Sequence, residues 1–249
     1  MKMIESGKQN QDVIMLLHGG GLSWWNYRKE AEILSRRFHV IMPVLDGHGG
    51  SDDDFSSIED NAARLIYYID TVFNGQVLLI GGLSLGGQIL IEMLSQRADI
   101  CRYAIIESAS VMPSKMTRAL VTPSISPSYG LIRRKWFARL QFNYLGMDES
   151  YFDDYYRDSV RISKDNMIAF LKASVDYAVK PQLSACLSRV HIIVGERETR
   201  QMLESAKLLS DRLPNSQLEI KPGLKHGEYS LNKPLEYVRE IVDMLTKHK

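Results

Sequence analysis

A single serine stands at the corner between a short apolar run and a stretch with helical spacing. Residues 77–80 have the length and the branched side chains of a buried strand, and the run ends at a pair of glycines. From Leu85 onward, apolar residues recur at helical spacing, so the chain turns from strand to helix at Ser84. The flanking Gly82 and Gly86 lack the Cβ atoms that would clash in such a tight turn. A hydroxyl exposed at a helix N-terminus, where backbone N–H groups stabilise negative charge, is suited to attack a carbonyl group.

The Gly-x-Ser-x-Gly pattern at residues 82–86, set between a strand and a helix, resembles the nucleophile elbow of the α/β-hydrolase family. A glycine-rich turn with an incidental serine is the alternative, because both residue types are common in turns. The resemblance extends over nearly the whole chain from Val13 onward. It implies an α/β fold in which Ser84 is the nucleophile.

Short apolar runs that predict buried strands alternate with helical patterns. The runs cover residues 13–17, 38–42, 77–80, 103–106, 190–194 and 217–220. Alternation of strand and helix predicts a mostly parallel, doubly wound sheet with its functional loops at the carboxyl ends of the strands. Few residues precede the first clear run, so the N-terminal hairpin of the family must be shortened or partly absent. We therefore expect about six or seven strands, flanked by helices.

The alternation stops between residues 111 and 184, where no convincing strand is found. Four prolines punctuate this segment, namely Pro113, Pro123, Pro127 and Pro181. Helical spacing covers residues 131–145, 151–160 and 166–178. The insertion resembles the helical cap of α/β-hydrolases, so residues 111–184 are assigned to a cap and residues 1–110 and 185–249 to the core. Frequent aromatic residues predict that the cap covers Ser84 with an apolar pocket.

The resemblance implies the two other members of a catalytic triad. The family keeps its general base in a loop after the last strand, which is the position of His226. Its acid commonly follows a strand-ending glycine by three residues, which places it at Glu198, although aspartate is more usual there. Glu196 and Glu107 remain alternatives for the acid, and His226 taken alone could be a surface residue. The chain order Ser84, Glu198, His226 matches that of the family.

The run at residues 13–17 leads into His18 and three glycines, which predicts a loop whose backbone approaches another group closely. By resemblance, this loop supplies one N–H group of an oxyanion hole, and we assign it to Gly20. Gly21 is the neighbouring possibility, because three consecutive glycines leave the register open by one residue. The second donor is the N–H of Leu85. The family uses a histidine at the position of His18 to hold the loop, so we expect a structural role for it.

Aromatic residues follow the glycine loop, in a segment at residues 23–37 whose spacing predicts a helix capped by Ser23. Trp25 is a candidate for the substrate pocket together with Gly21 and, from the cap, Trp136. Burial of the aromatic cluster in the core is the equally weighted alternative, since tryptophan serves both purposes.

Nothing in the sequence indicates a metal or another cofactor. Asp46 and His48 belong to a stretch that resembles a structural turn near the active-site rim of the family. The three aspartates at residues 52–54 lack the alternating ligands of a calcium loop and are expected to be solvated.

The overall composition is balanced. Charged residues make up 24% of the chain and the formal net charge is +1, which excludes a chain-wide attraction to nucleic acid. Cys101 and Cys186 are far apart in sequence and are expected to be reduced thiols. The first residues lack the apolar core of a signal peptide, and no later run is long enough to span a membrane. We expect a cytoplasmic protein that is not bound to a membrane; its oligomeric state is not indicated.

These observations predict a serine hydrolase that cleaves a carboxylic ester or thioester with a small to medium acyl group. The reaction would pass through an acyl-enzyme on Ser84. A lyase or carbon–carbon bond hydrolase on the same fold is an alternative, and so is a ligand sensor that signals to a partner protein. The basic run at residues 133–135 could contact an anionic group of a substrate, although such runs usually face solvent.

Overall fold

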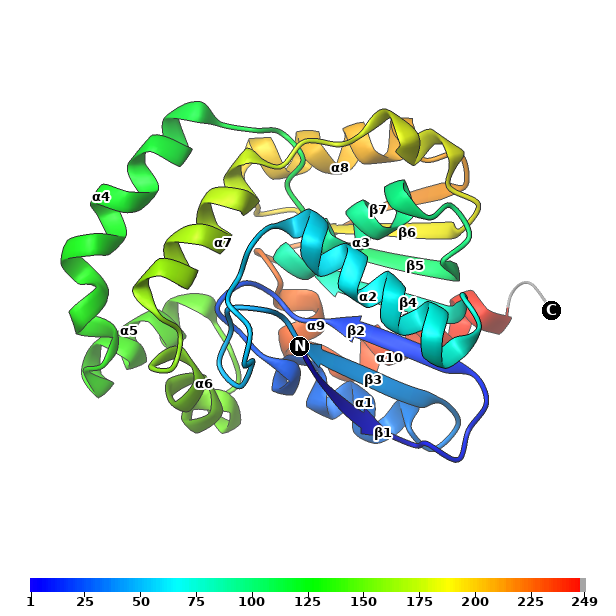
Figure 1. Cartoon of the computed structure of the whole chain (residues 1–249), viewed down its shortest axis with the longest axis horizontal. Helices are drawn as coiled ribbons and strands as arrows, with labels where there is room; N and C mark the ends of the chain where they lie inside the picture. Colours follow the sequence, from blue (N-terminus) through cyan, green and yellow to red (C-terminus); the bar gives the residue numbers. More distant parts are fainter. Residues whose placement is uncertain (247–249) are drawn as a thin grey trace.

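Seven strands form one twisted sheet in the computed structural model, which describes residues 1–246 (Figure 1). The strands in chain order are β1 (Lys2–Ser6), β2 (Val13–Leu17), β3 (His39–Val44), β4 (Val77–Leu83), β5 (Cys101–Glu107), β6 (Arg189–Gly195) and β7 (Ser216–Lys221). Their order across the sheet is β1-β3-β2-β4-β5-β6-β7, in which only β1 runs antiparallel to its neighbour. The prediction of a mostly parallel sheet with six or seven strands is therefore confirmed.

Strand β1 is the edge strand that the sequence pattern did not show. It pairs antiparallel with β3, with Lys2 opposite Val44. Its side chains are exposed or only half-buried, since Met3 packs against one hydrophobic cluster and Ile4 against the other. An edge strand with only partial burial on both faces lacks the continuous apolar run by which the central strands are recognised.

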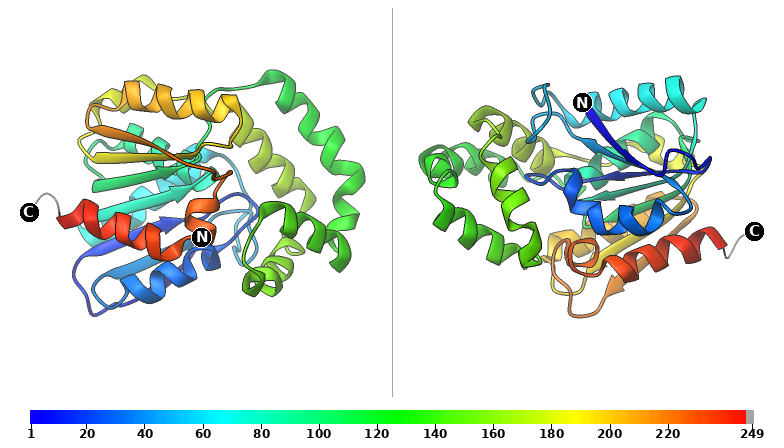
Figure 2. Two further views of the ribbon diagram at one scale, coloured as in Figure 1. Left: turned by 180° about the vertical axis from the view of Figure 1, so that it is seen from behind. Right: turned by 90° about the horizontal axis from the view of Figure 1, so that it is seen from below.

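Successive side chains of the central strands point to opposite faces of the sheet, and each face is covered by its own helices. In β2, Met15 and Leu17 belong to one hydrophobic cluster, whereas Ile14 and Leu16 belong to the other. The first face is covered by α2 (Ile58–Phe73), α3 (Leu85–Gln96) and α8 (Arg200–Arg212). The second is covered by α1 (Arg28–Leu34) and α10 (Pro234–Thr246), which lie below the sheet in the right-hand view of Figure 2.

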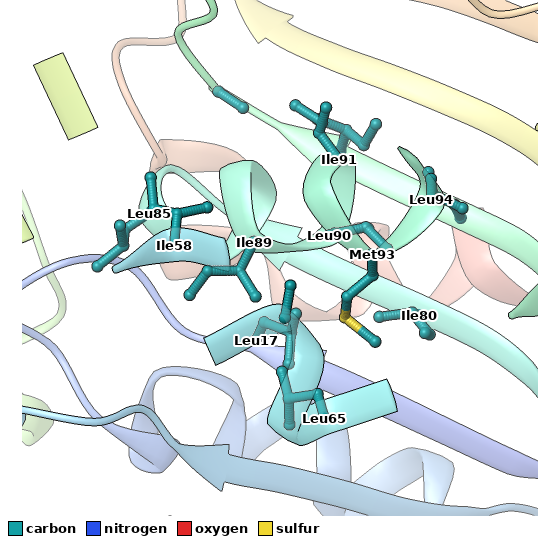
Figure 3. Close-up of a cluster of buried hydrophobic side chains, with 14 of the residues drawn as sticks. Leu17, Ile58, Leu65, Ile80, Leu85, Ile89, Leu90, Ile91, Met93 and Leu94 are labelled. Carbon is teal, nitrogen blue, oxygen red and sulfur yellow. The ribbon is translucent and has the colours of Figure 1, made fainter. Parts of the chain in front are cut away.

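Helix α3, which begins directly after Ser84, lies deep in the core. Its residues 85–94 are all buried, including the polar Gln88 and Glu92. Figure 3 shows Ile89 and Met93 of this helix facing the side chains of neighbouring elements, among them Leu17 and Ile80. The helix N-terminus at Ser84 is therefore held in place by packing on all sides.

One of the helix predictions needs correction. The predicted helix at residues 23–37 is divided into a short 3₁₀ helix η1 (Trp24–Tyr27) and α1. Ser23 makes no capping hydrogen bond, because its hydroxyl donates to the Gly49 carbonyl 3.2 Å away. Residues 234–247 have the apolar spacing of an amphipathic helix, and they form α10 as far as Thr246; Lys247 lies outside the described residues.

Four helices lie between β5 and β6 in sequence and form a separate group beside the sheet (Figures 1 and 2). They are α4 (Lys115–Ile132), α5 (Lys135–Leu145), α6 (Phe152–Ser159) and α7 (Lys164–Asp176), and we call them the cap helices. Pro123 and Pro127 were expected to interrupt the helical pattern, but both lie inside α4. Only Val121 and Ile132 of α4 are buried, so water can solvate the carbonyl groups that these prolines leave without an N–H partner.

Three short helical elements lie between the longer helices and strands. They are the 3₁₀ helices η2 (Glu149–Tyr151) and η3 (Pro181–Ala185) and the helix α9 (Glu228–Asn232). Cys101 and Cys186 are both buried and are not joined by a disulfide. Within residues 1–246, no helix combines the length and the apolar character needed to cross a membrane.

Candidate active site

Ser84 occupies the sharp turn between β4 and α3. Its backbone has φ 53°, a left-handed conformation that non-glycine residues rarely adopt, and its N–H donates to the Glu107 carbonyl at 2.8 Å. A Cβ atom at Gly86 would overlap the Leu17 carbonyl oxygen, and one at Gly82 would overlap the Gly86 carbonyl oxygen. Glycine is therefore required on both sides of the serine, as the sequence pattern indicates.

The imidazole of His226 lies between the hydroxyl of Ser84 and the carboxylate of Glu198. Its Nε2 is 3.1 Å from the Ser84 Oγ, and its Nδ1 is 2.8 Å from the Glu198 Oε2. The His226 side chain is 46% exposed, whereas the Glu198 side chain is 1% exposed. Because the carboxylate accepts a hydrogen bond from the Nδ1–H, it favours the tautomer whose Nε2 can accept the serine proton.

The Glu198 carboxylate is held by three hydrogen bonds. Its Oε1 accepts from the Ser108 hydroxyl at 2.7 Å and from the Gly195 N–H at 2.8 Å, in addition to the contact of Oε2 with His226. Burial alone would raise the pKa of Glu198, but the hydrogen bond and charge of His226, with the other two donors, bring it below its ordinary value. The group is therefore a carboxylate anion at neutral pH.

The carboxylates of the two alternative acids accept hydrogen bonds from backbone N–H groups and not from His226. Glu196 is exposed, and its Oε2 accepts from the Gly223 N–H at 2.8 Å. Glu107 is buried, and its Oε1 accepts from the Ser230 N–H at 3.1 Å. Burial raises the pKa of Glu107 to about 7. Of the three carboxylates, Glu198 is the one whose hydrogen bonds include His226.

Ser108 was not identified from the sequence. It follows β5 directly, at the same edge of the sheet as Ser84, and its backbone φ is 53°. Its hydroxyl donates to Glu198 and lies 3.3 Å from the N–H of Gly227, from which it accepts. Ser108 therefore links the loop that carries the acid to the loop that carries His226. The only signal in the sequence was its position at the carboxyl end of a central strand.

Gly20 lies against Leu85, the residue that follows Ser84. A Cβ atom built on Gly20 would be 3.6 Å from the Leu85 side chain, and Leu85 is the first residue of α3. Among residues 1–246, neither of their backbone N–H groups donates a hydrogen bond to a protein acceptor. Both are available to a ligand, and the helix dipole adds to the attraction of Leu85 for an anion. Gly21 has φ +77° and borders open space.

Two buried histidines hold the loops around the elbow. The Nε2 of His18 accepts from the Leu45 N–H at 3.1 Å, and its Nδ1 is 2.9 Å from the Gly19 carbonyl oxygen. Burial lowers the pKa of His18 well below its ordinary value, so the ring is neutral. The ring of His48 stacks on that of Phe170 in α7, with the ring centres 4.6 Å apart. Both histidines therefore contact structural partners rather than Ser84.

A cleft of about 530 Å³ opens beside the imidazole. It is lined by residues from α5, from the start of α8 and from the loops that precede α8 and α9: Tyr144, Leu145, Arg197, Glu198, Thr199, Met202, Lys225 and His226. Helix α5 therefore forms one wall of this cleft, and α8 with the two loops forms the other.

Neither Trp25 nor Trp136 is among the residues that line this cleft. Trp25 is fully buried, and its Nε1 donates to the Asp158 Oδ2 of α6 at 2.9 Å, so it joins the core to the cap. Trp136 is 64% exposed on α5 and contacts the ring of Phe137. The basic run at residues 133–135 is likewise exposed and does not line the cleft.

A parallel sheet with a serine elbow at its carboxyl edge defines the fold class of this chain. Residues 14–240 match the model of a family described as alpha/beta hydrolase family. The chain therefore belongs to the alpha/beta hydrolase family, as the elbow and the terminal histidine indicated.

Solved structures with the same fold include enzymes with different substrates. An esterase from Thermogutta terrifontis is 18% identical with a TM-score of 0.78, covering 99% of this chain and 93% of the other. A meta-cleavage product hydrolase from Pseudomonas fluorescens is 17% identical with a TM-score of 0.74, covering 100% and 94%. At these identities the likeness shows the fold alone.

A curated relative matches over a shorter stretch. The magnesium-chelatase 30 kDa subunit of Rhodobacter capsulatus is 45% identical over 49 residues. The match covers 20% of this chain and spans only 17% of the length of that protein.

The buried Glu107 predicts a measurable pH dependence of stability. Its pKa is about 7 in the folded protein and near 4.5 in an unfolded chain, so the folded state holds the proton more tightly. The stability contributed by the protonated Glu107 is fully present below the unfolded pKa of 4.5. It is lost as the pH rises through the folded pKa of about 7. Glu107→Gln keeps an acceptor for the Ser230 N–H, and we expect it to raise the free energy of unfolding at pH ~8 by about 2–3 kcal/mol.

Urea unfolding at pH ~5 and ~8 measures this difference. The exposed Glu196→Gln variant is the matched control and should follow the wild-type pH dependence. A Glu107→Gln protein with the same pH dependence as the wild type would show that Glu107 is already ionised at neutral pH.

Proposed function

We propose that this protein is a serine hydrolase that cleaves a carboxylic ester or thioester of a small to medium acyl group through an acyl-enzyme on Ser84. The observation that carries the proposal is the continuous line of contacts from the Ser84 Oγ through both ring nitrogens of His226 to Glu198. Such a line activates a hydroxyl that is otherwise a weak nucleophile at neutral pH.

In the proposed reaction, the Ser84 hydroxyl attacks the carbonyl carbon while His226 Nε2 takes its proton. Glu198 holds the imidazole and stabilises its positive charge. The N–H groups of Gly20 and Leu85 bind the oxyanion of the tetrahedral intermediate. His226 then donates the proton to the leaving alcohol or thiol, and the acyl-enzyme remains. Water, deprotonated by His226, attacks the acyl group and releases the acid, which restores Ser84.

Hydrogen bonds fix the cap helices to the core, which supports a pocket of constant size. Gln88 of α3 donates to the Ser174 carbonyl of α7 at 2.8 Å, and Trp25 donates to Asp158 of α6. A cap that is fixed at these points leaves the cleft of about 530 Å³ beside His226 as space for part of the substrate. Gly21, which borders open space beside Gly20, is retained as a proposed pocket residue.

Two cations line the cleft close to His226. Arg197 and Lys225 are both exposed, and neither has a carboxylate within ion-pair distance among residues 1–246. Unpaired cations in a cleft raise the local concentration of anions. They favour a substrate with a negative group on its acyl or leaving part.

A carbon–carbon bond hydrolase or a lyase is the second candidate. The fold likeness to a meta-cleavage product hydrolase favours the former, and the same hydroxyl and imidazole could serve it. The two candidates differ in the bond that is cleaved and in whether an ester yields an acyl-enzyme.

A two-part experiment tests the proposal. The full chain is first labelled with a fluorophosphonate, and the modified residue is identified by mass spectrometry. Nitrophenyl esters and thioesters of increasing acyl length, with and without a terminal carboxylate, are then assayed for burst kinetics. We expect labelling of Ser84 and a burst with a short ester. Labelling without turnover of any ester would reject the esterase proposal and leave the carbon–carbon alternative, whereas absence of labelling would reject both.

The contacts of Ser108 predict a positioning role in this reaction. Removing its hydroxyl deletes one hydrogen bond to the Glu198 carboxylate, and a bond to a charged group contributes about 1.5–3 kcal/mol. We expect Ser108→Ala to lower kcat about tenfold with little change in KM, and Ser108→Thr to retain more activity. Steady-state kinetics measure this split. An unchanged kcat would show that the Gly195 N–H and His226 hold the carboxylate without help.

A further inference from the structure

Helix α4 presents a row of apolar side chains to solvent. Met116 is 75% exposed, Leu120 55% and Leu131 39%. Pro123 and Pro127 lie between them and are exposed as well, so an apolar residue recurs every three or four positions along one side of the helix. The buried residues of α4 lie on the opposite side. This amphipathic helix therefore has an apolar face that no part of residues 1–246 covers.

Helix α5 continues the exposed apolar row. Trp136 is 64% exposed, Leu140 61% and Tyr144 88%, and a spacing of four residues places all three on one side of the helix. Together with the three residues of α4, they make up six of the eleven large apolar side chains that are exposed within residues 1–246. The exposed apolar surface is thus concentrated on two adjacent cap helices.

The same segment carries a strong positive charge. Residues 108–147 contain no acidic residue and six basic ones: Lys115, Arg118, Arg133, Arg134, Lys135 and Arg139. Since the whole chain carries +1 and this segment +6, the remainder of the chain carries −5. Three of the six have a carboxylate from outside the segment nearby: Arg118 and Asp176 at 3.2 Å, Lys135 and Asp153 at 4.0 Å, and Arg139 and Glu149. The other three make no ion pair within the described part of the chain.

We infer that α4 and α5 form a docking surface for an anionic lipid bilayer. Helix α4 lies at the outer edge of the molecule, with α7 between it and the sheet (Figure 1). The apolar row from Met116 to Leu131 is about 22 Å long. A long apolar row at the outer edge of the molecule, with cations at both ends, fits the plane of a membrane surface, where apolar side chains enter the acyl region and cations meet anionic headgroups. Trp136 and Tyr144 are the aromatic types enriched at that depth.

The charge of the segment argues against a second copy of this chain as the occupant. A symmetric dimer through α4 and α5 would place the same six basic residues against each other. Like charges that face each other across an interface are repulsive, and only half of these residues have a carboxylate nearby. An anionic bilayer presents the opposite sign over the whole length of the row.

The docking surface adjoins the cleft of the candidate active site. Tyr144 and Leu145 line that cleft and belong to the same helix as Trp136. A bilayer bound to α5 would therefore lie near the cleft opening. Docking itself depends on α4 and α5 and not on the chemistry at Ser84, so it can be tested without a substrate.

Vesicle flotation of the full chain tests the inference. The probes are vesicles of phosphatidylcholine alone and vesicles with about 30% phosphatidylserine, each at low and high salt. We expect binding to the anionic vesicles at low salt, weakened at least about tenfold by high salt or by omission of phosphatidylserine. The double variant Met116→Gln and Leu120→Gln should weaken binding about tenfold as well. The matched control is Tyr67→Gln, whose side chain is 69% exposed on α2, outside the proposed docking surface, and it should bind as the wild type does.

Circular dichroism and fluorophosphonate labelling of Ser84 establish that the variants are folded. Three outcomes would overturn the inference. The first is absence of binding to anionic vesicles at low salt, and the second is equal binding by the α4 double variant and the wild type. The third is a dimer in light scattering that the double variant abolishes, which would assign the surface to a second copy.

Discussion

Ser84→Ala is expected to lower the turnover of any ester that this protein hydrolyses by about 10⁴-fold or more. Without the hydroxyl there is no covalent intermediate, and His226 Nε2 has no proton to remove from the nucleophile at 3.1 Å. The residual rate would come from the N–H groups of Gly20 and Leu85 and from substrate binding. Because the hydroxyl contributes mainly to the transition state, KM should change little. The measurement is kcat and KM for the best ester of the acyl series, together with fluorophosphonate labelling.

A second serine of the same helix is the matched control. Ser95 lies near the other end of α3, and its hydroxyl donates to the Ile91 carbonyl at 2.8 Å. Ser95→Ala should retain wild-type turnover and labelling. Turnover that survives in Ser84→Ala would contradict the proposed mechanism, since no other hydroxyl is hydrogen-bonded to His226 among residues 1–246.

The sheet and the elbow were predictable because local pattern and burial agree there. Residues 13–17 form a continuous apolar run, and all five are buried in the central strand β2. The glycines around Ser84 are required by backbone atoms only a few residues away or in the adjacent strand. Where a structure depends on such local or regularly spaced contacts, the residue types record it directly.

The contacts that decide whether an aromatic side chain is buried lie far away in sequence. The Nε1 of Trp25 binds Asp158, which is 133 residues further along the chain. No local pattern distinguishes a tryptophan buried beneath a cap from one that lines a cleft, so Trp25 could only be a candidate. The same reason explains why Ser108 was missed, because its partners Glu198 and Gly227 belong to two later loops.

Helix α4 shows that a local sequence pattern can also favour the wrong structure. Pro123 and Pro127 favour an interruption on local grounds, and the helix continues through them because its outer side is solvated. The helix propensity of single residues predicts structure poorly in a segment such as α4, which packs against few other residues. The apolar row of α4 was also hidden in the sequence, since a stripe that faces solvent has the same spacing as one that faces a core.

The choice among three acids required the structure for a related reason. Glu107 is the last residue of β5, and Glu198 follows the neighbouring strand β6 by three residues. Their side chains therefore start at the same edge of the sheet. Glu196 is only two residues from Glu198. The Glu196 and Glu107 carboxylates are oriented by backbone N–H groups that are distant in sequence. Gly223 donates to Glu196, and Ser230 donates to Glu107. Glu198 alone of the three is left with an oxygen directed at His226.

Glu198→Gln is accordingly expected to lower kcat by about 10³–10⁴-fold at neutral pH. The substituted amide is nearly isosteric, so the loop geometry should survive, but it can donate a hydrogen bond to Nδ1 of His226. That bond favours the tautomer with a proton on Nε2, which cannot accept the proton of Ser84. The lost negative charge also leaves the imidazolium of the transition state without its buried counter-ion, which lies 2.8 Å away in the wild type.

Glu196→Gln and Glu107→Gln are the matched comparisons, because each replaces one of the other two carboxylates by the same amide. Both should stay within about threefold of wild-type kcat, since neither carboxylate forms a hydrogen bond to His226. Glu198→Asp should lie between the wild type and the amide variant, because it keeps the charge but shortens the side chain by one methylene group. A large loss in Glu107→Gln with near-normal activity in Glu198→Gln would instead make the acid the buried carboxyl at the end of β5, whose pKa is about 7.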